Sequence, residues 1–123
     1  MKLSLDQGNA DYRITAYEPG RISINREVYE TSLLLTPWQL DTGWPPNTVA
    51  ELEARHLEPL AALEPELILL GTGERLVFPD RSLLVSLIGA GIGVEVMDTA
   101  AACRTFNLVM AEDRRVVAAL LPR

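Results

Sequence analysis

Two short apolar runs, at residues 67–70 and 92–97, constrain the fold of this chain more than any other feature. The first run is continuous, which is typical of a strand buried on both faces of a sheet, and we expect the second to be a buried strand as well. The first run ends at a Gly-Thr-Gly sequence, and the second ends at Asp98, a residue type that caps helices well. A segment with helical periodicity follows each run. Two buried strands, each followed by a helix, predict an α/β domain.

The first third of the sequence has a different pattern. Apolar and polar residues alternate over residues 12–17 and again over 22–25, and the Pro-Gly pair between them is typical of a turn. This alternation predicts an antiparallel β meander. A third strand is predicted over residues 28–35 and is ended by Pro37. Together with the two buried strands, the meander indicates a mixed sheet covered by helices.

The remaining segments complete a single predicted domain over residues 1–123. The longest helix is predicted over residues 99–112, because Ala102, Phe106 and Val109 recur on one side. The other predicted elements are one or two short helices over 48–63 with a capping box at Thr48 and Glu51, a brief strand over 76–78, a helix over 80–88 and a last strand over 115–121. We expect the Gly-Thr-Gly sequence and the start of the longest helix at the same rim of the sheet.

Composition excludes several classes of function. The 123 residues include 11 Lys and Arg against 17 Asp and Glu, a formal net charge of −6, which is poorly suited to neutralising the phosphates of a nucleic acid. One cysteine, Cys103, cannot form an internal disulfide, and with one histidine, His56, it is too little for a structural zinc site. The longest uncharged run, residues 82–94, is too short to cross a bilayer, and no secretory signal is found. We therefore expect a cytoplasmic protein without a metal site.

Two glycine-rich sequences are candidates for ligand binding. The Gly-Ala-Gly-Ile-Gly sequence over residues 89–93 has Val94 where a dinucleotide fingerprint has its third glycine, and the predicted helix precedes it instead of following it. We expect a helix end there, and no cofactor. Gly71, Thr72 and Gly73 follow a buried strand, where ligands bind in open α/β sheets. They form either a backbone cradle for an anion or a turn that needs positive φ.

Four polar residues of the second half have two interpretations. Glu95 lies inside an apolar strand, where a carboxylate is costly to bury without a partner. Arg104 and Asn107 share a face of the longest predicted helix, with Thr105 to one side. Either an ion pair joins Glu95 to Arg104, or all four side chains line a recognition pocket that faces the Gly-Thr-Gly sequence.

The cysteine and the two tryptophans each have a structural and a functional interpretation. Cys103 is either a packed thiol in the core or a nucleophile with His56 as its base, and we assign no catalytic residue. Trp38 and Trp44 lie in a long loop over residues 36–48 that holds three prolines. Loops of this length are unusual in compact domains, so the tryptophans either anchor a partner or cover the sheet.

Two segments carry a family resemblance: PELILLGTGE at residues 65–74 and GIGVEVMDTAAACRTFNLVMAEDRRVVAALLP at residues 91–122. They resemble the domain-of-unknown-function 498 family, whose eukaryotic branch includes the mitochondrial respiratory complex I assembly factor 3. The family's motif residues fall on Gly71, Thr72, Gly73, Glu95, Met97, Asp98, Thr99, Cys103, Arg104, Thr105 and Asn107. The resemblance implies a three-layer α/β fold with a mixed central sheet of about five strands and no established catalytic residues. Since we recognise no presequence of the kind found in the mitochondrial branch, we expect a bacterial stand-alone member.

Two functional hypotheses follow. The first is a non-enzymatic cytoplasmic protein that binds a protein partner through the tryptophan loop and the polar edge around Gly71 and Arg104. Such a protein would assist the assembly of a membrane complex such as respiratory complex I, with peripheral association because no transmembrane segment is predicted. The second is a small-molecule-binding protein or weak enzyme that uses the polar pocket.

Overall fold

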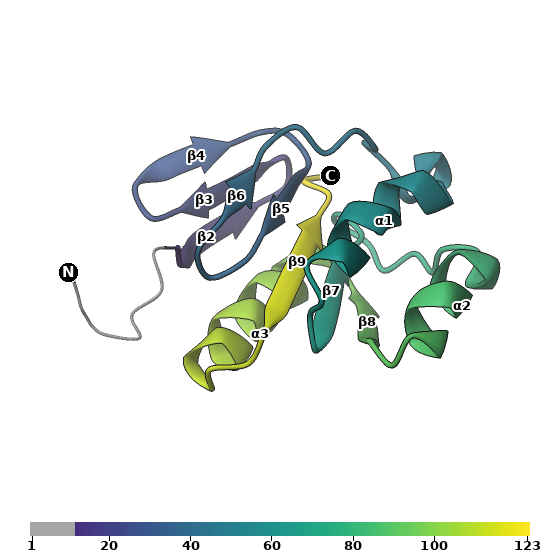
Figure 1. The fold of residues 1–123 in the computed structure, drawn as a ribbon. Coiled ribbons are helices and arrows are strands. Elements are labelled where there is room, and N and C mark those ends of the chain that lie inside the picture. Colours follow the sequence, from purple (N-terminus) through teal and green to yellow (C-terminus); the bar gives the residue numbers. More distant parts are fainter. Residues whose placement is uncertain (1–11) are drawn as a thin grey trace.

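The computed structural model describes residues 12–123, which form two sheets and three α-helices (Figure 1). Strands β2 (Ile14–Glu18), β3 (Arg21–Ile24) and β4 (Glu27–Tyr29) make a three-stranded antiparallel sheet. Gly20, with a φ of 84°, makes the tight turn between β2 and β3. The predicted antiparallel meander is confirmed.

The predicted third strand over residues 28–35 is wrong, because the segment contains two strands. β4 ends at Tyr29, and β5 (Leu33–Leu35) belongs to the second sheet, where it pairs with the last strand, β9 (Val116–Leu120). All three leucines of β5 are buried, whereas Val28 in β4 is exposed. Three consecutive buried side chains require a position inside a sheet that is covered on both faces.

The second sheet is mixed and has five strands in the order β6-β5-β9-β7-β8. β7 (Leu67–Gly71) is parallel to both of its neighbours, β9 and β8 (Gly93–Met97). β5 is antiparallel to both of its neighbours, β9 and the short β6 (Leu40–Asp41), which lies within the predicted loop. The predicted mixed sheet of five strands is confirmed, and its middle strand is the last in the chain.

β8 is not the doubly buried strand that the sequence predicts. Among the strands of residues 12–123 it lies at the edge of the sheet and pairs with β7 alone, so Glu95 is exposed, and Val94 and Val96 are only partly buried. The burial of β8 depends on a distant part of the chain: β9 pairs with the other side of β7, and no strand of residues 12–123 pairs with the outer side of β8.

Helices cover both faces of the five-stranded sheet. α1 (Ala54–Ala62) and α2 (Arg81–Gly89) cover one face, where the core includes Ile68 of β7. α3 (Thr99–Ala111) and the three-stranded sheet cover the other face, where Phe106 is fully buried. The three predicted layers are confirmed.

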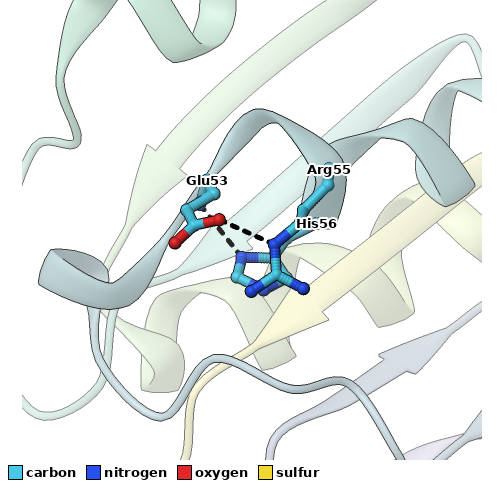
Figure 2. Close-up of polar contacts among 3 residues, drawn as sticks. All are labelled: Glu53, Arg55 and His56. Atoms are coloured by element: carbon cyan, nitrogen blue, oxygen red, sulfur yellow. Dashed lines mark hydrogen bonds and ion pairs between the residues drawn. The ribbon is translucent and has the colours of Figure 1, made fainter.

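The capping box lies one helix later than predicted. Thr48 precedes the 3-10 helix η1 (Val49–Glu51) but makes no side-chain cap. The box instead begins α1, where the N–H of Glu53 donates to Nδ1 of His56 over 3.0 Å (Figure 2). The first turn of α1 is therefore held by a buried histidine.

Residues 76–78 form an exposed loop and not the predicted brief strand. The hydroxyl of Thr72 donates to the carbonyl of Arg75 over 2.5 Å and accepts from the N–H of Val77 over 3.2 Å. These bonds hold the loop against the end of β7, so its backbone does not extend to pair with another strand.

Candidate functional site

The Gly-Thr-Gly sequence forms a bend, here called the glycine bend (residues 71–73), at the rim where β7 and β8 end. The N–H of Thr72 donates to the carbonyl of Met97, the last residue of β8, over 2.9 Å. The N–H of Gly73 donates to the hydroxyl of Thr99 over 2.8 Å, and the N–H of Thr99 donates to the carbonyl of Gly73 over 2.9 Å. The glycine bend and the start of α3 thus lie at the same rim, as the sequence predicts.

Thr99 also joins the glycine bend to the residue that follows β9, the middle strand of the five-stranded sheet. Its fully buried hydroxyl donates to the carbonyl of Leu121 over 2.6 Å, and the N–H of Leu121 donates to the carbonyl of Gly71 over 3.0 Å. Because the N–H groups of Thr72 and Gly73 are bonded within the protein, they are not free to hold an anion. With a φ of 102° at Gly73, these bonds favour the turn over the backbone cradle.

Arg104 and Asn107 lie where α3 contacts the three-stranded sheet. The side chain of Asn107 accepts from the N–H of Ile14 over 3.1 Å and donates to the carbonyl of the same residue over 2.7 Å, so it attaches α3 to β2. Arg104 is exposed, and Thr105 is partly buried. A hollow of about 260 Å³ between α3 and β2 is lined by Cys103, Arg104 and Asn107 but by no residue of the glycine bend.

Glu95 and Arg104 do not form the ion pair that the sequence suggests. The one ion pair among residues 12–123 joins Arg55 to Glu53 over 2.6 Å at the start of α1 (Figure 2). Glu95 needs no buried partner, because the edge position of β8 exposes its carboxylate to water. The structure therefore does not bring Glu95 together with the polar residues of α3.

The glycine bend borders a different hollow, of about 460 Å³, at the carboxyl ends of the parallel strands. Thr72, Arg75 and Arg123 are among its lining residues, together with Thr48 and its neighbours before α1. Sequence reasoning missed both arginines. Arg75 could have been found, because it follows the end of a strand where α/β sheets bind ligands. Arg123 could not, because its position depends on the placement of β9 between β5 and β7.

Cys103 and His56 lie on opposite sides of the five-stranded sheet. Cys103 is buried in the core beneath α3, whereas His56 is in α1, which covers the other face. Nδ1 of His56 is occupied by the N–H of Glu53. Burial raises the pKa of the Cys103 thiol to about 12, although the nearby Arg104 acts in the opposite direction. This geometry does not provide a thiol with a base, and no cluster of three or more metal-ligating side chains occurs within residues 12–123.

We expect Cys103 to be unreactive in the folded protein. At pH 8 the thiolate is the reactive form, and a thiol with a pKa of about 12 is almost entirely protonated. The rate of labelling by a disulfide reagent should therefore rise by at least about a hundredfold when the protein is unfolded in urea. Equal rates in the folded and unfolded protein would contradict this burial.

The two tryptophans have different surroundings. Trp44 is 5% exposed, and its indole N–H donates to the carbonyl of His56 over 3.0 Å, so it covers the sheet as part of the core. Trp38 is 55% exposed and lines a mainly apolar hollow of about 220 Å³ with Leu63 and Pro65. Of the two, Trp38 is the side chain that a partner can reach.

A family model described as "Protein of unknown function (DUF498/DUF598)" matches residues 14–121. The chain belongs to this family. Three of the residues that carry the family resemblance have structural roles in this chain. Asp98 accepts from the N–H of Ala101 over 2.8 Å and caps α3, and Thr99 bonds the glycine bend. Asn107 attaches α3 to β2.

Several known proteins resemble the chain along most of its length. It is 31% identical over 117 residues to the "13 kDa major membrane protein" of Francisella tularensis, covering 94% of this chain and 95% of that relative. It is 34% identical over 119 residues to NADH dehydrogenase (ubiquinone) 1 alpha subcomplex assembly factor 3 of Danio rerio, covering 94% of this chain and 67% of that relative. A crystal structure of a Bordetella parapertussis protein has a TM-score of 0.86 at 40% identity, over 93% of this chain and 98% of that one. Within residues 12–123, no helix has the length and apolar character needed to span a membrane.

Proposed function

We propose that this member of the family is a non-enzymatic cytoplasmic protein that binds a protein partner and assists the assembly of a membrane complex such as the respiratory NADH dehydrogenase. The similarity to an assembly factor across 94% of the chain supports this role. The observation in the structure that carries it is Trp38, a large aromatic side chain exposed beside an apolar hollow.

Trp38 is presented on a fixed turn. The N–H groups of Trp38 and Gln39 donate to the hydroxyl of Thr36 over 3.2 and 2.9 Å, and the N–H of Thr36 donates to the carbonyl of Gln39 over 2.9 Å. Because the turn is already ordered, binding costs little conformational entropy. Tryptophan is enriched among the residues that dominate binding energy, and an apolar hollow beside it is a site for a partner's side chain.

The variant Trp38→Ala tests this role in cells from which the gene has been deleted. We expect it to restore less than about a tenth of the assembled NADH dehydrogenase that the wild-type gene restores, as measured on native gels, because a central aromatic anchor contributes 2 kcal/mol or more, about thirtyfold in affinity. Leu108→Ala, which removes an exposed apolar side chain from α3, is the matched control and should complement fully. Unchanged complementation by Trp38→Ala would exclude Trp38, and normal assembly in the deletion strain would exclude the assembly role.

The alternative function is binding of a small anionic molecule in the hollow beside the glycine bend. Arg75 and Arg123 line this hollow together with one carboxylate, Glu74, and neither arginine forms an ion pair within residues 12–123. Guanidinium groups bind carboxylates and phosphates with two parallel hydrogen bonds. A thermal-shift screen with small carboxylates and phosphates should then give stabilisation that Arg75→Ala abolishes. No shift at millimolar ligand would exclude this alternative.

A further inference from the structure

The outer side of β8 is a free sheet edge. β8 pairs with β7 and with no other strand of residues 12–123, and it lies at the end of the five-stranded sheet beside α2 (Figure 1). An open edge presents unpaired N–H and C=O groups that can bond to a strand from another chain.

The hydrogen bonds at the two ends of β8 show which of its backbone groups are free. The N–H of Gly93 donates to the carbonyl of Glu66 over 3.0 Å, and the carbonyl of Met97 accepts from Thr72 over 2.9 Å. In a parallel ladder, alternate residues direct their backbone groups to the same side. Residues 93, 95 and 97 therefore face β7, and the N–H and C=O groups of Val94 and Val96 face outward.

The side chains around this edge are apolar on one face and acidic on the other. Val94 and Val96 pack against the core beneath α1 and α2. α2, which packs on β8, exposes Val85 and Ile88, at 57% and 58%. On the opposite face of the sheet, Glu95 is exposed and has no ion-pair partner within residues 12–123.

The charge of Glu95 disfavours a second copy of this chain at the edge. A two-fold pairing that used all four free backbone groups would place Val94 opposite Val96 of the second copy. Glu95 would then face the same carboxylate of the second copy, and like charges directly opposite each other destabilise a sheet. A strand with a basic residue at that position would instead form a favourable cross-strand pair.

We propose that β8 accepts an extended segment of the protein partner, which adds a strand to the sheet and places a Lys or Arg opposite Glu95. This proposal rests on the proposed partner-binding function and gives it a second contact surface. Backbone hydrogen bonds to Val94 and Val96 supply the affinity, and Glu95 selects a basic segment over an acidic one. The net charge of −6 also favours a basic partner.

The test uses two short synthetic peptides of alternating threonine and valine, one with a central lysine and the other with a central glutamate. In the free protein, the amide protons of Val94 and Val96 should exchange with solvent faster than that of Glu95, as measured by NMR. The lysine peptide should slow exchange at both valines by about tenfold or more. It should also bind about fivefold more tightly than the glutamate peptide.

Variants separate the backbone contribution from the charge contribution. Val96→Pro removes an outward N–H without removing a bond to β7, and it should abolish peptide binding. Glu95→Lys should reverse the preference between the two peptides, whereas Glu27→Lys, at an exposed site on β4 of the three-stranded sheet, should leave it unchanged. Equal binding of the two peptides, no protection of the valine amides at saturating peptide, or a dimer that protects them without peptide would overturn the proposal. None of these results changes the complementation by Trp38→Ala, so the two surfaces are tested separately.

Discussion

Replacement of Thr99 by valine is expected to lower the free energy of unfolding by about 2–4 kcal/mol, because each buried polar group that loses its partner costs about 1–3 kcal/mol. Valine has nearly the same shape as threonine, so the core packing is retained. The lost hydroxyl leaves the N–H of Gly73 and the carbonyl of Leu121 without their partners. Urea denaturation of the purified protein measures the difference.

Thr105→Val is the matched control for this substitution. Thr105 lies on the same helix and is partly exposed, and no hydrogen bond of its hydroxyl is found within residues 12–123. Its replacement should change stability by less than about 0.5 kcal/mol. Similar losses in the two variants would show that the bonds of Thr99 at the glycine bend are not its main contribution.

Gly73→Ala is expected to cost about 3 kcal/mol, for two reasons that add. The φ of 102° lies in a region that residues with a side chain rarely adopt, and an added methyl group would overlap the backbone carbonyl of Arg123. Gly89→Ala is a control that should change stability in the opposite direction, because Gly89 is the last residue of α2 and an added methyl group there would meet open space. Alanine there should stabilise the protein by roughly 0.5–1 kcal/mol. A loss below about 1 kcal/mol for Gly73→Ala would contradict the close approach of the chain at this bend.

Local patterns predicted those elements whose surroundings follow from a few neighbouring residues. The run that becomes β7 is buried on both faces, and Asp98 caps α3 as its position suggests. The antiparallel strands near the start of the chain are predicted equally well, because the alternation of apolar and polar residues and the Pro-Gly pair involve only neighbouring residues. The glycine bend and the start of α3 meet because both follow the ends of parallel strands in one sheet.

Properties that depend on distant parts of the chain were not predictable. The sequence of β8 is mainly apolar apart from Glu95, but its burial depends on whether another strand lies beyond it. Trp38 and Trp44 lie in the same proline-containing segment of the sequence, yet only the indole N–H of Trp44 donates to a carbonyl of α1. The separation of Glu95 from Arg104 has the same origin, because it depends on which strands α3 crosses. Whether the proposed site residues bind a ligand or a partner stays a prediction.

The position of β9 affects how the chain acquires its fold during synthesis. This strand separates β5 from β7 in the sheet, although a ribosome makes it after all other strands of residues 12–123. Until β9 has left the exit tunnel, the pair of strands β5 and β6 has no backbone contact in the sheet with the pair β7 and β8. The edges of β5 and β7 are then open to chaperones or to other nascent chains. The fold of residues 12–123 therefore depends on the late insertion of a central strand, and the nascent polypeptide is most prone to aggregation before that strand becomes available.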